Sequence, residues 1–359
     1  CKTRGSLMKR ILLASASIFA FAGVASAEVT FGGDASLGYN EAVEGGFYYG
    51  ADLTVTMTQE LDNGLTASAT GDINFADDDG DTTRGSDQLN TSYVLSLSTD
   101  MATLSFGDVD PVGDAIWSGV SGSAVAGFND GDVHFDTALF DGILRGDVMY
   151  AGVSAYVSFG VDTNGDAIGG NDLDAMQLAA TGSFGAFGFI AAYQEAFGPT
   201  PEIIALAGTA SLMGADVKVA YETDGTETSI GAGVSYPVGP VTLGGYFTSN
   251  DIADDSYGVS ADYASGPIAV SAAYDSDAGT DSVEVDVSYD VGNGITALAG
   301  AGSDLTNSTV YYYVAGEVDL GGGASFLLSY ADDESAAAND AIGGPEYNQG
   351  ITALLSFKF

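Results

Sequence analysis

Apolar and polar residues alternate along most of this chain, in short segments separated by glycine-rich or acidic connections. In segment 282–291 one alternating set is Val283, Val285, Val287, Tyr289 and Val291, and the other set is wholly polar. The same pattern occurs in 53–58, 65–70 and 351–359. Alternate side chains of a β-strand point to opposite faces, so the pattern predicts strands with one apolar and one polar face. A soluble β-sandwich has the same alternation, and the fold therefore remains open at this point.

The connections between these segments are of two kinds, which alternate along the chain. The tight, glycine-rich kind comprises 62–64, 184–186, 213–215, 237–240, 265–267, 292–294 and 321–323. The longer, acidic kind comprises 76–87, 162–174, 224–227, 249–256, 275–281 and 331–348. Short turns at one end and long loops at the other are typical of outer-membrane barrels. The sequence thus predicts an all-β, transmembrane antiparallel β-barrel with an even strand number, and the segments count up to about 20 strands.

Aromatic residues mark both ends of the predicted strands. Tyr236, Tyr263 and Tyr289 each precede a tight turn, and a second set precedes the acidic connections: Tyr193, Tyr221, Phe247, Tyr274 and Tyr330. Two aromatic girdles, one at each membrane interface, are typical of transmembrane barrels. The chain also ends on an aromatic residue, Phe359, which we expect at an interface. The last strand should close the ring against the first, 28–39, and bring Lys358 near Glu28.

The first 27 residues have the pattern of a secretory signal peptide. Met8-Lys9-Arg10 is basic, 11–24 is largely apolar, and Ala25-Ser26-Ala27 is a small-residue cleavage motif. We expect residues 1–7 to lie upstream of the true start, residues 1–27 to be removed on export through the periplasm, and 28–359 to form one barrel domain in the outer membrane.

Charge narrows the choice of partners. Only Arg84, Arg145, Lys218 and Lys358 would remain against 50 acidic residues after that cleavage. Nucleic acid is excluded as a partner, because phosphate binding needs clusters of Lys and Arg. The mean hydropathy is nevertheless +0.17, whereas disordered acidic chains have low hydrophobicity. Past residue 27 no apolar run approaches the roughly 18 residues of a spanning helix, so strands are the remaining way across a membrane.

Four stretches resemble the general diffusion porins of alphaproteobacteria (Rhodobacter type): 28–35, 318–325, 329–333 and 355–359. The resemblance implies a water-filled channel for passive diffusion of ions and small hydrophilic solutes. Family members are 16-stranded trimers whose third extracellular loop folds into the pore, and the segment count departs from that strand number. The implied partners are outer-membrane lipid and lipopolysaccharide, two further copies of the chain, and the barrel assembly machinery that recognises a terminal aromatic such as Phe359.

The inward loop implied by this resemblance would run from about 108 to 141, where clean alternation is missing. Its acids are Asp108, Asp110, Asp114, Asp130, Asp132, Asp136 and Asp141, and it also holds Trp117 and His134. The facing pore wall would carry Arg145, Asp147, Asp216 and Lys218, with Arg145 and Lys218 on the polar phase of their strands. Many carboxylates with few opposing cations should favour cations. Alternatively, the loop acids are merely solvated and the basic pair is a local charge match.

Other functions have weaker support in the sequence. The cluster 77–81 and similar acidic loops would suit Ca²⁺ or Mg²⁺, and no other cofactor is indicated. No catalytic set emerges, since the single histidine, His134, lacks a cysteine partner, so we expect no enzyme. A plugged barrel acting as an adhesin or anchor is one alternative. A secreted calcium-dependent β-solenoid is another, but its Gly-Gly-x-Gly-x-Asp repeats are absent.

Overall fold

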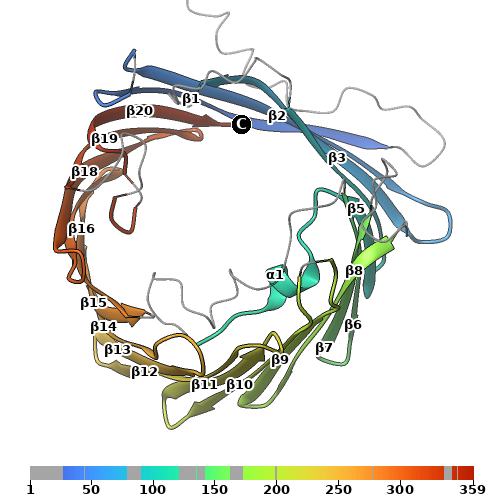
Figure 1. The fold of residues 1–359 in the computed structure, drawn as a ribbon. Coiled ribbons are helices and arrows are strands. Elements are labelled where there is room, and N and C mark those ends of the chain that lie inside the picture. Colours follow the sequence, from blue (N-terminus) through green and yellow to red (C-terminus); the bar gives the residue numbers. More distant parts are fainter. Residues whose placement is uncertain are drawn as a thin grey trace, which may run out of the picture.

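The computed structural model describes residues 27–43, 45–78, 90–120, 135, 142–161, 173–198, 200–277, 279–334, 342–345 and 347–359. The described chain forms one closed barrel of 20 antiparallel strands (Figure 1). The strands are β1 (Glu28–Asn40), β2 (Phe47–Glu60), β3 (Thr66–Asp78), β4 (Asn90–Ser98), β5 (Ala102–Gly107), β6 (Gly142–Tyr150), β7 (Val153–Val161), β8 (Leu173–Phe184), β9 (Phe187–Gln194), β10 (Ile203–Leu212), β11 (Ala215–Thr223), β12 (Thr228–Val238), β13 (Val241–Asn250), β14 (Ser256–Ser265), β15 (Ile268–Asp277), β16 (Thr280–Gly292), β17 (Ile295–Asp304), β18 (Thr309–Gly321), β19 (Ala324–Asp333) and β20 (Gly350–Lys358). One short helix, α1 (Val112–Ile116), lies between β5 and β6.

The strand number confirms the count made from the alternation and differs from the 16 that the family resemblance implied. Each strand pairs with the next in the chain, as in β3 with β4 and β4 with β5. Even β5, with six residues, holds a full antiparallel ladder to β6. Tight turns such as 213–214 and 239–240 connect the strands at one end, and the longer connections lie at the other. Among the described helical residues, none forms a helix long and apolar enough to cross a membrane.

The first and last strands close the ring, as predicted, but in a different register. Asp34 is the residue opposite Lys358, and the Phe359 N–H donates to the Gly33 carbonyl at 2.8 Å. Glu28 pairs instead with Thr58 of β2 and extends beyond the end of β20. The expectation that Lys358 lies near Glu28 was therefore wrong. Closing a barrel requires its strands to stagger, and this stagger displaces the two chain ends along the seam.

The two faces of the barrel follow the alternation. Val285 and Val287 are 47% and 40% exposed on the outside, while the intervening Asp286 points inward to the Tyr313 hydroxyl. On the inner face of β2–β4, polar side chains bond across strands, as in Thr56 to Thr70 and Ser68 to Ser96. Such a barrel presents an apolar surface to lipid and a polar surface to water. Among the described residues, two buried apolar clusters lie where connections fold back onto the inner wall.

Candidate pore constriction

The connection after β5 enters the barrel at a glycine that no other residue could replace without strain. Gly107 has φ +124°, and a Cβ built on it would lie 2.1 Å from the Tyr93 carbonyl oxygen. The next residue, Asp108, continues the contact with β4: its carboxylate accepts the Tyr93 N–H at 2.7 Å. The chain then passes into α1, which lies inside the ring against β7–β9 (Figure 1). This is the third connection at the loop end of the barrel, and its residues 108–120 turn inward as the family resemblance implied.

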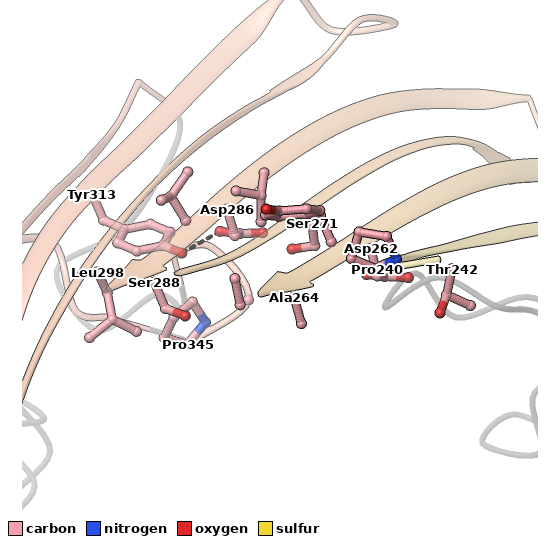
Figure 2. A pocket seen from close by; sticks show the side chains of 15 residues that line it. Pro240, Thr242, Asp262, Ala264, Ser271, Asp286, Ser288, Leu298, Tyr313 and Pro345 are labelled. Atoms are coloured by element: carbon pink, nitrogen blue, oxygen red, sulfur yellow. Dashed lines mark hydrogen bonds between the residues drawn. The ribbon is translucent and has the colours of Figure 1, made fainter. Parts of the chain in front are cut away.

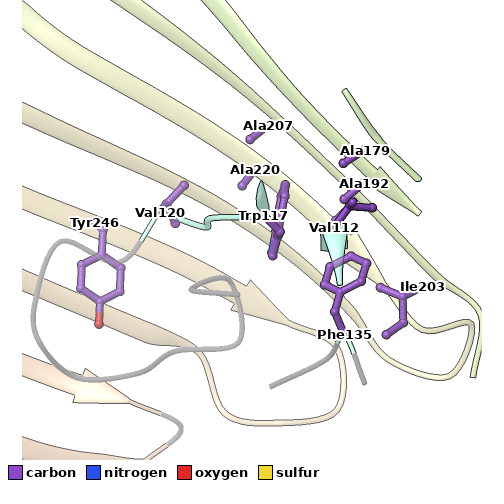
Figure 3. Close-up of a cluster of buried hydrophobic side chains, with 11 residues drawn as sticks. Val112, Trp117, Val120, Phe135, Ala179, Ala192, Ile203, Ala207, Ala220 and Tyr246 are labelled. Atoms are coloured by element: carbon purple, nitrogen blue, oxygen red, sulfur yellow. The ribbon is translucent and has the colours of Figure 1, made fainter. Parts of the chain in front are cut away.

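An apolar seat on the inner wall holds this inward segment (Figure 3). The side chains of Val112, Trp117, Val120 and Phe135 are buried in it. They pack on small or apolar residues of β8–β11 that point inward: Ala179, Ala192, Ile203, Ala205, Ala207 and Ala220. Because alanine methyl groups leave room above the strands, the segment can approach the wall closely. Burial of a large aromatic side chain such as Trp117 makes a large favourable contribution.

Polar side chains of the wall satisfy the buried donors of this segment. The Val112 N–H donates to the Ser158 hydroxyl at 3.0 Å, and the Gly113 N–H donates to the Gln177 amide oxygen at 2.8 Å. The indole N–H of Trp117 donates to the fully buried Glu222 carboxylate at 3.2 Å. A short helix leaves its first N–H groups without partners of its own, and unpaired buried donors are costly. These wall residues therefore fix where α1 sits.

The two basic residues of the pore wall also contact the inward segment. The Arg145 guanidinium bonds the Asp147 carboxylate at 2.9 Å, donates to the Asp110 carbonyl oxygen at 3.2 Å, and lies 5.7 Å from the Tyr156 ring centre. On β11, the Lys218 ammonium donates to the Ser118 hydroxyl at 2.7 Å. Both point into the lumen, on the polar phase of their strands. Each of these two side chains thus holds part of the inward segment against the wall.

The remaining predicted site residues lie in several places. Asp108 and Asp110 are exposed on the inward segment, and Asp114 lies in the first turn of α1. Asp216 accepts the Ser211 hydroxyl at 2.5 Å on the wall next to Lys218. Asp130, Asp132, Asp136 and His134 lie outside the described residues, and so do the side chains of 77–81. In the described part of the chain, no group of three or more His, Cys, Asp and Glu could hold a metal ion.

A set of acidic residues missed at the sequence level lies on the opposite part of the inner wall. Its members are Asp262 on β14, Asp275 on β15, and Glu284 and Asp286 on β16. Tyr246 donates to Asp275 and Tyr313 donates to Asp286. Asp262 and Asp286 line a recess of about 460 Å³ together with Ser271, Ser288 and Tyr313 (Figure 2). The polar phase of 282–291 already marked Glu284 and Asp286 as inward-facing.

The close fit of the loop on β12 yields a first prediction. A Cβ built on Gly231 would lie 2.3 Å from Cγ2 of Val120. Gly231→Ala should therefore push the inward segment off β12 and raise the single-channel conductance measured in planar bilayers. Val120→Ala removes the colliding methyl groups, so the double variant should return to the wild-type conductance. An unchanged conductance in Gly231→Ala would contradict the packing of Val120 on Gly231. A double variant with the same raised conductance as Gly231→Ala would contradict it too.

Comparison with known proteins places the chain in a family. It matches the Gram-negative porin family over residues 14–309. A mutant of the Rh. blastica porin is similar in structure, with a TM-score of 0.50, 19% identity, and coverage of 72% of this chain and 98% of that chain. Pseudomonas aeruginosa OccK5 (OpdH) is also similar, with a TM-score of 0.50, 11% identity, and coverage of 93% and 98%. Among curated proteins no match was found. The barrel, its inward third connection and the family match agree, and the chain belongs to the Gram-negative porins, which are channel proteins of the outer membrane rather than enzymes.

Proposed function

We propose that this outer-membrane channel lets ions and small hydrophilic solutes diffuse through it and that it prefers cations. The observation that carries the proposal is the distribution of charge on the inner wall. Arg145 and Lys218, two basic residues of the described inner wall, are both bonded to the inward segment. The acids of β14–β16 line the other part of the wall, and the described residues that border the recess in Figure 2 include no Lys or Arg.

This arrangement shifts the expected source of selectivity from the loop to the wall. The sequence pointed to the acids of the inward loop, with few opposing cations on the wall. In the fold, Asp108 bonds the backbone of β4, and Asp110 receives Arg145 through its carbonyl oxygen. Asp262 and Asp286, by contrast, border open recesses: both line the one in Figure 2, and Asp262 also lines a second of about 490 Å³ that reaches Lys218. Carboxylates in clefts with low-dielectric walls raise the local cation concentration.

The decisive measurement is the reversal potential of the reconstituted channel under a KCl gradient. A preference for cations should give a reversal potential of the sign expected for K⁺. A reversal potential of the sign expected for Cl⁻ would overturn the proposed preference for cations. The proposal that the protein forms a channel would still stand. If no conductance appeared at all, the alternative of a plugged adhesin or anchor would be favoured.

The proposal includes the assembly of the channel. We propose a homotrimer, following the family resemblance, embedded in lipid through its exposed apolar belt. Recognition by the barrel assembly machinery would use Phe359, which is 76% exposed at the end of β20 and stacks on Phe357. Contact with lipopolysaccharide through Ca²⁺ or Mg²⁺ at acidic loops such as 77–81 stays a prediction. Chemical cross-linking of native membranes would test the trimer.

A further inference from the structure

The described residues 342–345 and 347–349 of the connection between β19 and β20 also lie inside the barrel and pack on its inner wall. Ile342 and Tyr347 are 1% and 5% exposed, and they bond each other through their backbones in both directions. The short turn between them lies on the inner side of the ring near β18 (Figure 1). We refer to residues 342–345 and 347–349 as the last-loop arm. The arm is distinct from the segment that carries α1 and lies on a different part of the wall.

An apolar cluster holds the arm. Ile342 and Tyr347 pack with Tyr313, Ala315 and Ala331 of β18 and β19. The rings of Tyr313 and Tyr347 are 5.1 Å apart between centres at an angle of 64°, an edge-to-face contact that stabilises aromatic pairs. Alanine again provides the space on the strands. Buried apolar loop residues thus pack on small inward-facing residues of the strands at two places in this barrel.

Hydrogen bonds fix the two ends of the arm. At its tip, the Gly344 N–H donates to the Glu284 carboxylate of β16 at 3.0 Å. At its base, Gln349 donates to the Asp332 carboxylate at 2.8 Å and accepts the Asp333 N–H at 2.9 Å. The Asn40 amide, fully buried on β1, donates to the Gln349 carbonyl at 2.8 Å. The arm is thereby bonded to strands on both sides of the barrel seam.

The arm reaches well below the rim of the barrel. Glu284 is the fifth residue of the 13-residue strand β16, so Gly344 lies four residues from the loop end of that strand, or about 13 Å along it at 3.3 Å per residue. Gly344 and Pro345 border the recess that holds Asp286 and Ser288 (Figure 2). The first inward segment reaches a similar depth, because Val120 packs over Gly231, the fourth residue of β12.

We propose that the last-loop arm is a second side of the pore constriction, and that Glu284 is the residue that positions its tip. The size limit would then be set between the segment seated on β7–β12 and the arm seated on β16–β19. The inference rests on the channel itself and does not depend on its preference for cations. Uncharged solutes therefore test it separately from the proposed selectivity.

Chemical modification of the tip provides the first test. Cys1 is the only cysteine in the sequence and lies in the segment that we expect to be removed on export. Gly344→Cys therefore places a single thiol at the tip, and Leu305→Cys places a matched thiol on the exposed β17–β18 connection. A bulky methanethiosulfonate reagent should lower the single-channel conductance of Gly344→Cys in steps and leave that of Leu305→Cys unchanged. Complete modification at 344, confirmed by mass spectrometry, with no loss of conductance would overturn the proposal.

Glu284 variants provide the second test, read out by the swelling of proteoliposomes in neutral sugars. Glu284→Ala removes the acceptor of the Gly344 N–H, which should shift the ratio of seated to released arm by about tenfold or more and speed uptake of trisaccharides. Glu284→Gln retains an acceptor oxygen without the charge and should restore the wild-type size limit. Unchanged swelling with Glu284→Ala would show that Glu284 does not position the arm, as would equal widening by both variants.

Discussion

Replacing Trp117 with alanine should release the first inward segment from the wall and produce the largest rise in conductance of any single change in this channel. Trp117 is 4% exposed, at the centre of the cluster that holds Val112, Val120 and Phe135. Truncating a buried tryptophan costs about 3–5 kcal/mol. Since each 1.4 kcal/mol is a factor of ten, the ratio of seated to released segment should fall by about a hundredfold or more. The side chains of a released segment would face the water of the lumen and not lipid. The cost measured for buried side chains of soluble proteins therefore applies to this site.

Trp117→Phe separates packing from hydrogen bonding in the same position. Phenylalanine keeps a buried aromatic ring, although a smaller one, and loses the indole N–H, which donates to Glu222 at 3.2 Å. One hydrogen bond to a charged group contributes about 1.5–3 kcal/mol, so this variant should open the channel less than alanine does. Single-channel conductance and its noise are the measurements. If Trp117→Ala kept the single-channel conductance and noise of the wild type, the remaining wall contacts alone would hold the segment.

The barrel could be predicted from the sequence because its rules are local. Alternation with a period of two, glycine-rich turns and acidic connections each act over about ten residues, and together they indicated 20 strands. The seam register could not be predicted in the same way. Whether Lys358 faces Glu28 or Asp34 depends on the stagger of all 20 strands, which no single segment specifies.

The inward segments lay at the limit of what sequence reasoning reaches. Trp117 bonds a residue 105 positions away, and Gly113 bonds one 64 positions away. A signal was nevertheless present: Ala205 and Ala207 occupy the polar phase of β10, where a lumen should carry polar groups. An apolar patch inside a water-filled barrel requires something to cover it. Ile342 and Tyr347, apolar residues within an acidic connection, gave the matching hint for the second arm.

Asp262 should control the proposed preference for cations, because it borders both recesses of the inner wall. We expect Asp262→Asn to lower the ratio of K⁺ to Cl⁻ permeability and Asp262→Lys to lower it further or reverse it. A unit charge about 4 Å from a permeating ion changes its energy by about 1 kcal/mol even at the dielectric constant of water. Such an energy changes the local ion concentration roughly fivefold.

A matched control and a salt series make this last prediction specific. Asp62→Asn removes the same charge from the exposed tight turn between β2 and β3, so it should leave the reversal potential unchanged. The effect of Asp262→Lys should shrink between about 0.1 M and about 1 M KCl, because the screening length falls from roughly 10 Å to roughly 3 Å. If conducting Asp262→Lys channels kept the wild-type reversal potential at low salt, the acids of β14–β16 would not set the selectivity. The loop acids predicted from the sequence would then be the groups to test, beginning with Asp110.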